Sequence, residues 1–255
     1  MTQKKNRIIS LVPSQTELLV DLGLENSLVG ITKFCIYPAY LQKTKTIVGG
    51  TKNINIDKIK LLKPTIILCN KEENTKEIAV TCNKIAKTHV SNIYTLQDSL
   101  DLIKEYGILF SCEKKATKIS KKIEAEKSKF NEFIINNITL RVAYFIWKNP
   151  FMVAANNTFI NHILELNHFK NVFSYKERYP IIDIEKLSAK NIDLIFLSSE
   201  PYPFQEKHII ELKEKLPNTK ILLVNGEFFS WYGSRLLNAF SYFTTLRKRI
   251  NNFYI

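Results

Sequence analysis

Aromatic and polar side chains follow most of the predicted strands of this chain. In open parallel sheets, ligands bind beyond the carboxyl ends of the strands, so the loops at these ends form a candidate binding surface. Rings that can stack, together with a few hydrogen-bonding groups, suit a large, flat, partly apolar ligand. The residues predicted to contact such a ligand are Ser14, Tyr37, Lys71, Glu72, Trp147, Glu200, Tyr202, Phe229, Trp231, Tyr232 and Arg235.

Each group of candidate residues also has a purely structural interpretation. Aromatic residues in two sets of loops could form the seam where two lobes pack together. Glu72 and Glu73 are predicted to begin a helix, where the helix dipole alone accounts for their charge. Arg235 could simply pair with a nearby carboxylate. The sequence leaves these alternatives open.

Catalytic and metal-binding patterns are absent from the sequence. It contains no GxSxG, GxxxxGK[ST] or GxGxxG motif, and its count of only 7 glycines argues against a phosphate-binding loop. The four histidines, His89, His162, His168 and His208, show no HxxxH or HExxH spacing, so they are not expected to bind metal. We therefore predict no catalytic residue, no metal ligand and no cofactor, and a protein that is not an enzyme.

The elements that position these loops alternate between strand and helix, which predicts an α/β fold with parallel pairing. Residues 14–17, Ser-Gln-Thr-Glu, resemble a capping box that opens the first helix. Strands are expected at 7–12, 28–31, 66–70, 93–95, 141–147, 194–198 and 221–224. Helices are expected at 18–22, 54–62, 72–87, 96–110, 158–166, 182–190, 204–216 and 234–250.

Between the two runs of alternating elements lies a longer helical segment at 111–137. It lacks Gly and Pro, is rich in Lys and Glu, and returns apolar residues to one face. Ser111 is a candidate N-cap. We predict two Rossmann-like lobes with parallel sheets joined by this one long helix, with boundaries 1–110 for the N-terminal lobe, 111–137 for the connecting helix and 138–255 for the C-terminal lobe.

The two sides of this helix resemble each other. Residues 56–72 align with 184–200 without a gap, at an offset of 128, and 7–12 align with 141–146 at an offset of 134. Two matches in the same order predict that one structural unit occurs twice.

Composition and charge narrow the class of protein. The chain has 255 residues, 45% of them hydrophobic, which is enough for two modest cores. Its formal charge of +13 suggests an anionic partner, but the lysines are spread along the sequence, so we do not expect nucleic acid as a partner. No apolar run reaches the roughly 20 residues of a membrane span, so no membrane insertion is expected.

The N-terminal segment and the cysteine content indicate the cellular compartment in which the protein is expected. The apolar run at 8–12 is too short for a signal peptide, so the chain as written is expected in the cytoplasm, or in the periplasm or on a lipid anchor if a leader has been removed. The four cysteines show no zinc spacing and are expected to be free, mostly buried thiols.

Several segments resemble the helical-backbone (class III) substrate-binding proteins of ABC importers, which bind cobalamin, haem or ferric siderophores. The resemblance is carried by residues 7–18, the pair Tyr37 and Pro38, 48–50, 59–67, 171–173, 193–195 and 229–235. It covers nearly the whole chain and is greatest for the cobalamin-binding branch.

This resemblance implies a monomeric, rigid clamp that holds a small metal chelate in the cleft between two lobes, with Tyr37 and Trp231 in contact with the ligand. It also implies an ABC transporter permease as a partner, which such proteins engage through a surface Glu on each lobe. Here Lys76 lies near that place, with Glu77 one residue on. The alternatives are a chelatase-like enzyme acting on a tetrapyrrole, with Glu72, Glu73 or a histidine as proton acceptor, and a protein-interaction module.

Overall fold

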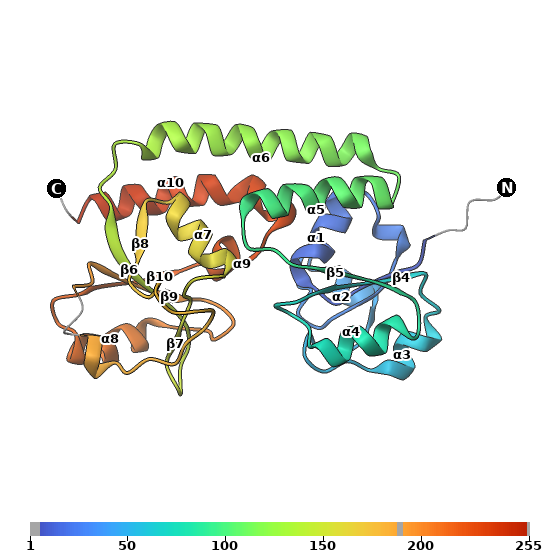
Figure 1. Ribbon diagram of the computed structural model, residues 1–255, viewed down its shortest axis with the longest axis horizontal. Coiled ribbons are helices and arrows are strands. Elements are labelled where there is room, and N and C mark those ends of the chain that lie inside the picture. Colours follow the sequence, from blue (N-terminus) through green and yellow to red (C-terminus); the bar gives the residue numbers. More distant parts are fainter. Residues whose placement is uncertain (1–5, 188–190, 254–255) are drawn as a thin grey trace. The chain divides into compact units, whose positions relative to one another are not determined.

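The computed structural model describes residues 6–187 and 191–253 and divides the chain into two compact units. The first unit contains Met1–Ile93, Gln97–Glu124 and Trp231–Leu237. The second contains Tyr94–Leu96, Ala125–Ser230 and Asn238–Ile255. Each is built on one sheet with helices around it (Figure 1).

The first unit has a five-stranded, fully parallel sheet in the order β3-β2-β1-β4-β5. Its central strands are continuous apolar runs buried on both faces, as expected for a parallel sheet covered by helices. The strands are β1 (Ile8–Ser10), β2 (Leu28–Ile31), β3 (Thr46–Ile47), β4 (Ile66–Asn70) and β5 (Lys87–Ser91). The helices are α1 (Pro13–Asp21), η1 (Glu25–Ser27), α2 (Leu41–Thr44), α3 (Ile56–Leu61), α4 (Lys76–Asn83) and α5 (Leu96–Leu109).

The second unit repeats this plan with one antiparallel strand. Its sheet has the order β10-β9-β6-β7, and β8 also pairs with β6. The strands are β6 (Leu140–Trp147), β7 (Met152–Val153), β8 (Phe169–Asn171), β9 (Leu194–Ser198) and β10 (Lys220–Val224). The helices that follow or flank them are α7 (Phe159–Leu166), η2 (Glu185–Leu187), α8 (Glu206–Lys215), α9 (Gly226–Ser230) and α10 (Leu236–Asn251). The short η3 (Gly233–Arg235) between α9 and α10 belongs to the first unit.

Helix α6 (Glu113–Ile134) connects the two units and is 22 residues long, about 33 Å. Its apolar residues Ala116, Ile119, Ile123, Phe130 and Ile134 are all buried, as their spacing predicts. The predicted fold class, two parallel-sheet α/β lobes with a long connecting helix, is therefore confirmed.

The internal repeat is confirmed at the level of strand register. In the first sheet Ile8 pairs with Ile66, and in the second Val142 pairs with Leu194. The offset of 134 relates Ile8 to Val142, and the offset of 128 relates Ile66 to Leu194. The two units therefore share the register of their central strands.

Two predicted helix starts are wrong. Helix α1 begins at Pro13, its N-cap is Val12 without a side-chain hydrogen bond, and Ser14 lies inside the helix, so 14–17 form no capping box. Ser111 has φ +56°, and α6 begins two residues later, so Ser111 is not its N-cap.

The segment after β4 also differs from prediction. The helix expected at 72–87 is limited to α4, because Thr75 caps it by accepting the N–H of Ile78 and Asn70 holds Glu72 in a turn. The strand expected at 93–95 lies instead at 87–91. This edge strand carries Lys87, Thr88 and His89, so no apolar run revealed it.

The helix expected at 182–190 is reduced to the short η2, and residues 188–190 lie outside the described part of the chain.

Candidate functional site

The loop after β2 presents an apolar surface on the first unit. The buried Cys35 anchors it, since its N–H donates to the Thr32 carbonyl at 3.1 Å and its Sγ lies 3.1 Å from the Thr16 hydroxyl. Its neighbours turn outward: Phe34 is 49%, Ile36 40% and Tyr37 37% exposed. Of the three, only Tyr37 was predicted as a site residue. The exposure of the other two follows from the anchoring of Cys35, which the sequence does not reveal.

Tyr37 contacts a second segment of the same unit, Trp231–Arg235. Its ring lies edge-on to Trp231, with ring centroids 5.8 Å apart, and the Arg235 guanidinium lies 4.2 Å from the Tyr37 centroid and 5.0 Å from that of Trp231. Such cation–π contacts add to the packing of the rings. We call Tyr37, Trp231, Arg235 and Glu17 the aromatic–arginine cluster.

Glu17 fixes the guanidinium in this cluster. Arg235 Nε donates to Glu17 Oε2 at 3.0 Å, and Nη2 lies 3.0 Å from Oε1, so both carboxylate oxygens are engaged. Both side chains are mostly buried, at 11% and 18% exposure. The structure thus shows Arg235 paired with a carboxylate, and that pair holds the cation against two rings.

Beneath the cluster lies a buried polar network centred on Gln15. The Gln15 amide Nε2 donates to Ser91 Oγ at 2.7 Å and to the Tyr232 hydroxyl at 2.9 Å, and its Oε1 accepts from the Tyr106 hydroxyl at 2.8 Å. Burial raises the pKa of Tyr106 and of Tyr232 above the usual value, so both phenols stay protonated. Tyr232 was predicted to contact ligand; here it anchors the Trp231–Arg235 segment.

Gly233 and Ser14 complete this anchor. Gly233 has φ +84°, a conformation that L side chains rarely adopt, and its N–H donates to Ser99 Oγ at 2.9 Å. Ser14 is buried in α1, and its carbonyl lies beside Gly233. Ser14 therefore lies under the cluster.

The remaining candidates of the first unit lie in the turn after β4. Lys71 is exposed, and the Glu72 carbonyl accepts from Lys52 Nζ at 2.6 Å. Burial raises the pKa of the neighbouring Glu73. Lys71 and Glu72 thus belong to the turn between β4 and α4.

The second unit has an aromatic cluster of its own at the carboxyl ends of β6 and β9. Trp147 is 40% exposed and lies edge-on to Tyr202 at 5.7 Å, and Tyr202 also contacts Phe204 and His208. His208 Nδ1 accepts the Gln205 N–H at 2.8 Å, and burial lowers its pKa, so the ring remains neutral.

Two further candidates of this unit have inward partners. The Ser230 hydroxyl donates to the Glu200 carboxylate. Phe229 is fully buried and packs on Tyr144 and Phe243 at 5.0 and 5.1 Å, so the structure places it in the core.

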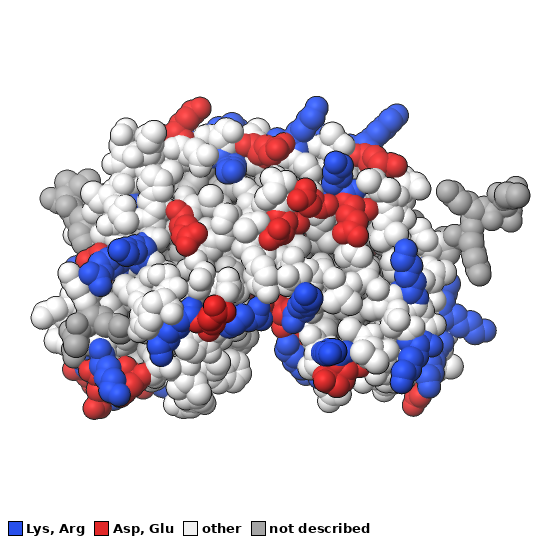
Figure 2. Space-filling model, in the orientation of Figure 1, with Lys and Arg blue, Asp and Glu red and all other residues white. Residues whose placement is uncertain are grey.

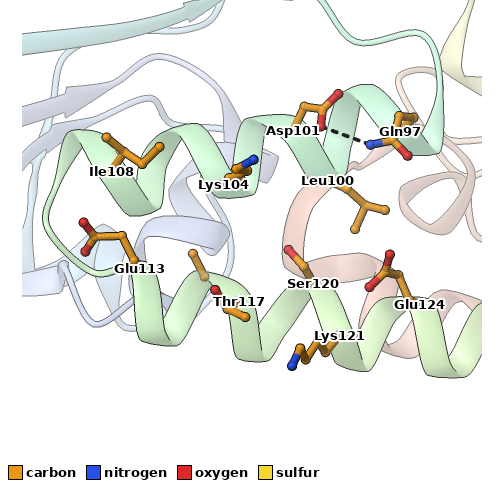
Figure 3. Close-up of a pocket in the computed structure, with 11 residues that line it drawn as sticks. Gln97, Leu100, Asp101, Lys104, Ile108, Glu113, Thr117, Ser120, Lys121 and Glu124 are labelled. Atoms are coloured by element: carbon orange, nitrogen blue, oxygen red, sulfur yellow. Dashed lines mark hydrogen bonds between the residues drawn. The ribbon is translucent and has the colours of Figure 1, made fainter.

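A separate groove of about 440 Å³ lies between α5 and α6 in the first unit. Side chains of both helices line it, among them Leu100, Ile108 and Thr117, and Gln97 donates to Asp101 at 3.0 Å (Figure 3). None of the predicted site residues lines it. The aromatic–arginine cluster therefore remains the better candidate.

Metal-binding groups are not assembled in the described residues: no three His, Cys, Asp or Glu side chains come together there to hold an ion. The four cysteines are free thiols, and Cys35, Cys69 and Cys82 are buried. In the same part of the chain no helix is long and apolar enough to cross a membrane.

Comparison with known proteins identifies the class. The family model described as periplasmic binding protein matches residues 8–219, and the chain belongs to this family. The resemblance to the helical-backbone substrate-binding proteins, predicted from the sequence, is thereby confirmed.

Among individual relatives, an uncharacterized ABC transporter substrate-binding lipoprotein, YvrC of Bacillus subtilis, is 26% identical over 206 residues, covering 76% of this chain but only 63% of its own length. The vitamin B12-binding protein of Vibrio cholerae is 25% identical over 194 residues, covering 75% of this chain and 70% of its own length.

Solved structures agree on the fold. The periplasmic vitamin B12 binding protein BtuF of Vibrio cholerae superposes with a TM-score of 0.79 at 23% identity, covering 96% of this chain and 98% of its own. The periplasmic heme-binding protein RhuT of Roseiflexus, in its apo form, gives a TM-score of 0.82 at 14% identity, covering 96% and 99%.

Proposed function

We propose that this protein binds a metal chelate, either a cobalamin-like corrinoid, haem or a ferric siderophore, without turning it over. The observation that carries the proposal is the aromatic–arginine cluster beside the exposed loop of Phe34, Ile36 and Tyr37. Exposed rings offer stacking surface to a macrocycle or an aromatic chelator, and the fixed guanidinium sets the position of those rings. Relatives named for vitamin B12 binding support this ligand class.

We further propose that it serves as the substrate-binding component of an ABC importer at the cell envelope. Its support is family membership and a relative named as a substrate-binding lipoprotein of an ABC transporter. Deletion of its gene should abolish uptake of the labelled chelate that the purified protein binds. Unchanged uptake would refute this role without affecting the binding proposal.

The binding proposal is tested by titrating the purified protein with cobalamin, haem and ferric siderophores while following tryptophan fluorescence. Trp231 lies against Tyr37, so a coloured chelate bound at the cluster should quench it saturably. Tyr37→Ala should weaken binding by about tenfold because it removes an exposed stacking ring, whereas Tyr37→Phe should retain it.

Tyr40→Ala is the matched control, because Tyr40 is another exposed tyrosine near the same loop, with its hydroxyl on Glu25. It should leave binding unchanged. Quenching by none of the three ligand classes would overturn the proposal, and metal insertion or removal during incubation, seen in the absorption spectrum, would instead indicate a chelatase.

A further inference from the structure

The two edges of the parallel sheet in the first unit differ in charge. All strands run in one direction, so their amino ends share one edge, here called the amino edge. Arg7 directly precedes β1, Lys63 lies three residues before β4, and Lys87 begins β5. Register confirms that these strand starts are neighbours, since Ile8 pairs with Ile66 and Ile66 with Lys87.

Helices that return from the opposite edge add more cations. Lys60 lies in the last turn of α3 and Lys84 is the C-cap of α4. The Lys115 ammonium lies directly against Gly23, which follows the end of α1. Exposed basic residues from several separate segments therefore meet at the amino edge: Arg7, Lys60, Lys63, Lys84, Lys87 and Lys115.

The carboxylates at this edge, Asp21 at the end of α1, Glu25 in η1 and Glu113 at the start of α6, are fewer than the cations. None of the six pairs with a carboxylate within the described ranges; the Arg7 guanidinium donates instead to the carbonyls of Leu62 and Lys63. Lys4 and Lys5 add charge next to Arg7 in the sequence. Figure 2 shows basic side chains gathered at the end of this unit that holds α3 and α4.

The opposite edge of the same sheet is mixed in sign. There Lys52 and Lys71 lie among Glu72 and Glu73, in the turns that follow the carboxyl ends of the strands, and Glu77, in the first turn of α4. The six cations of the amino edge therefore lie on the side of this unit that does not carry the aromatic–arginine cluster.

We propose that the amino edge of the first unit is a docking surface for an anionic lipid membrane. Its cations come from strand starts, helix ends and a loop, so they form a broad surface and not one stripe along a single helix. None of the six lies next to an exposed aromatic side chain in the sequence. A surface of spread lysines suits a planar array of negative headgroups, whereas single-stranded nucleic acid is held by cations together with stacking rings. Docking by this edge leaves the cluster of the same unit facing away from the lipid.

The test is sedimentation of the full chain with vesicles of phosphatidylcholine alone and of phosphatidylcholine mixed with phosphatidylglycerol. The protein should bind only the anionic vesicles, and less at higher salt because the contacts are screened. The variant K60E/K63E/K84E/K87E should bind at least roughly tenfold more weakly, since each lysine near such a surface contributes separately.

The control K104E/K118E/K121E/K122E makes the same charge change at exposed positions of α5 and α6 in the same unit. It should retain vesicle binding. Equal loss in the control, equal binding to both vesicle types, no vesicle binding by the wild-type chain, or preferential binding of DNA over anionic vesicles would each overturn the proposal. Thermal unfolding verifies that both quadruple variants fold. If K60E/K63E/K84E/K87E does not fold, the double variant K63E/K87E replaces it, with a smaller expected loss of vesicle binding. None of these outcomes depends on which chelate the protein binds.

Discussion

Glu17 and Arg235 are 218 residues apart in the chain, yet they form a two-point ion pair, with both contacts at 3.0 Å. The pair holds the guanidinium over the ring of Tyr37 at 4.2 Å. It thus joins the first helix of the first unit to a segment that returns to this unit near the C-terminus.

Removing the carboxylate should therefore cost both stability and binding. Glu17→Ala leaves a mostly buried guanidinium unpaired, and we expect a loss of about 3 kcal/mol in the free energy of unfolding. Arg235→Lys should weaken chelate binding by about tenfold, because an ammonium cannot reproduce the planar two-point contact or stack on two rings. Denaturant unfolding and the fluorescence titration measure these effects. Lys129→Ala, which removes an exposed ion pair with Glu126, should change stability by less than about 1 kcal/mol.

Gln15→Leu tests the network beneath the cluster. Leucine is similar in size but leaves the hydroxyls of Tyr106, Tyr232 and Ser91 without their amide partner in a buried site, which should cost about 3 kcal/mol of unfolding free energy. Urea denaturation measures the change. The same substitution at the exposed Gln97 should cost less than about 1 kcal/mol; a comparable loss there would show that the network has no special role.

The buried tyrosines predict loss of stability at alkaline pH. Burial raises the pKa of Tyr106, Tyr144 and Tyr232 above the value of 10.0 expected in the unfolded chain. The folded state therefore retains these protons where the unfolded state releases them. Their contribution is complete below about pH 10 and declines as the pH rises toward their folded pKa values. Unfolding free energies measured from pH 8 upward should fall above about pH 10, and Tyr232→Phe should make that fall shallower.

Phe229→Ala separates core packing from ligand contact. Because the side chain is fully buried between Tyr144 and Phe243, we expect a loss of about 3–5 kcal/mol in the free energy of unfolding. Phe229→Leu should cost less and leave a folded protein whose affinity for the chelate is unchanged. A large drop in affinity for the folded Leu variant would show that Phe229 contributes to ligand binding after all.

The sequence determined those features that depend on local pattern. The apolar runs of β4 and β9 have the bounds that were predicted, because burial on both faces of a sheet requires a continuous apolar run. The buried face of α6 was also predicted correctly, because a helix that buries one face repeats its apolar residues at helical spacing. The repeat could be read for the same reason, since equal registers require equal patterns in both copies.

Only the tertiary structure decided which candidates lie together. Tyr37, Trp231 and Arg235 could be named in advance, but their contacts with one another, and the pairing of Arg235 with Glu17, depend on the path of Trp231–Leu237 back to the first unit. Phe229, Trp231 and Tyr232 are all buried, whereas Tyr37 and Trp147 are partly exposed, because packing, not residue type, decides exposure. Likewise, the lysines are dispersed along the sequence and gather at one edge because parallel strands place their starts, and the ends of the returning helices, on the same side of the sheet.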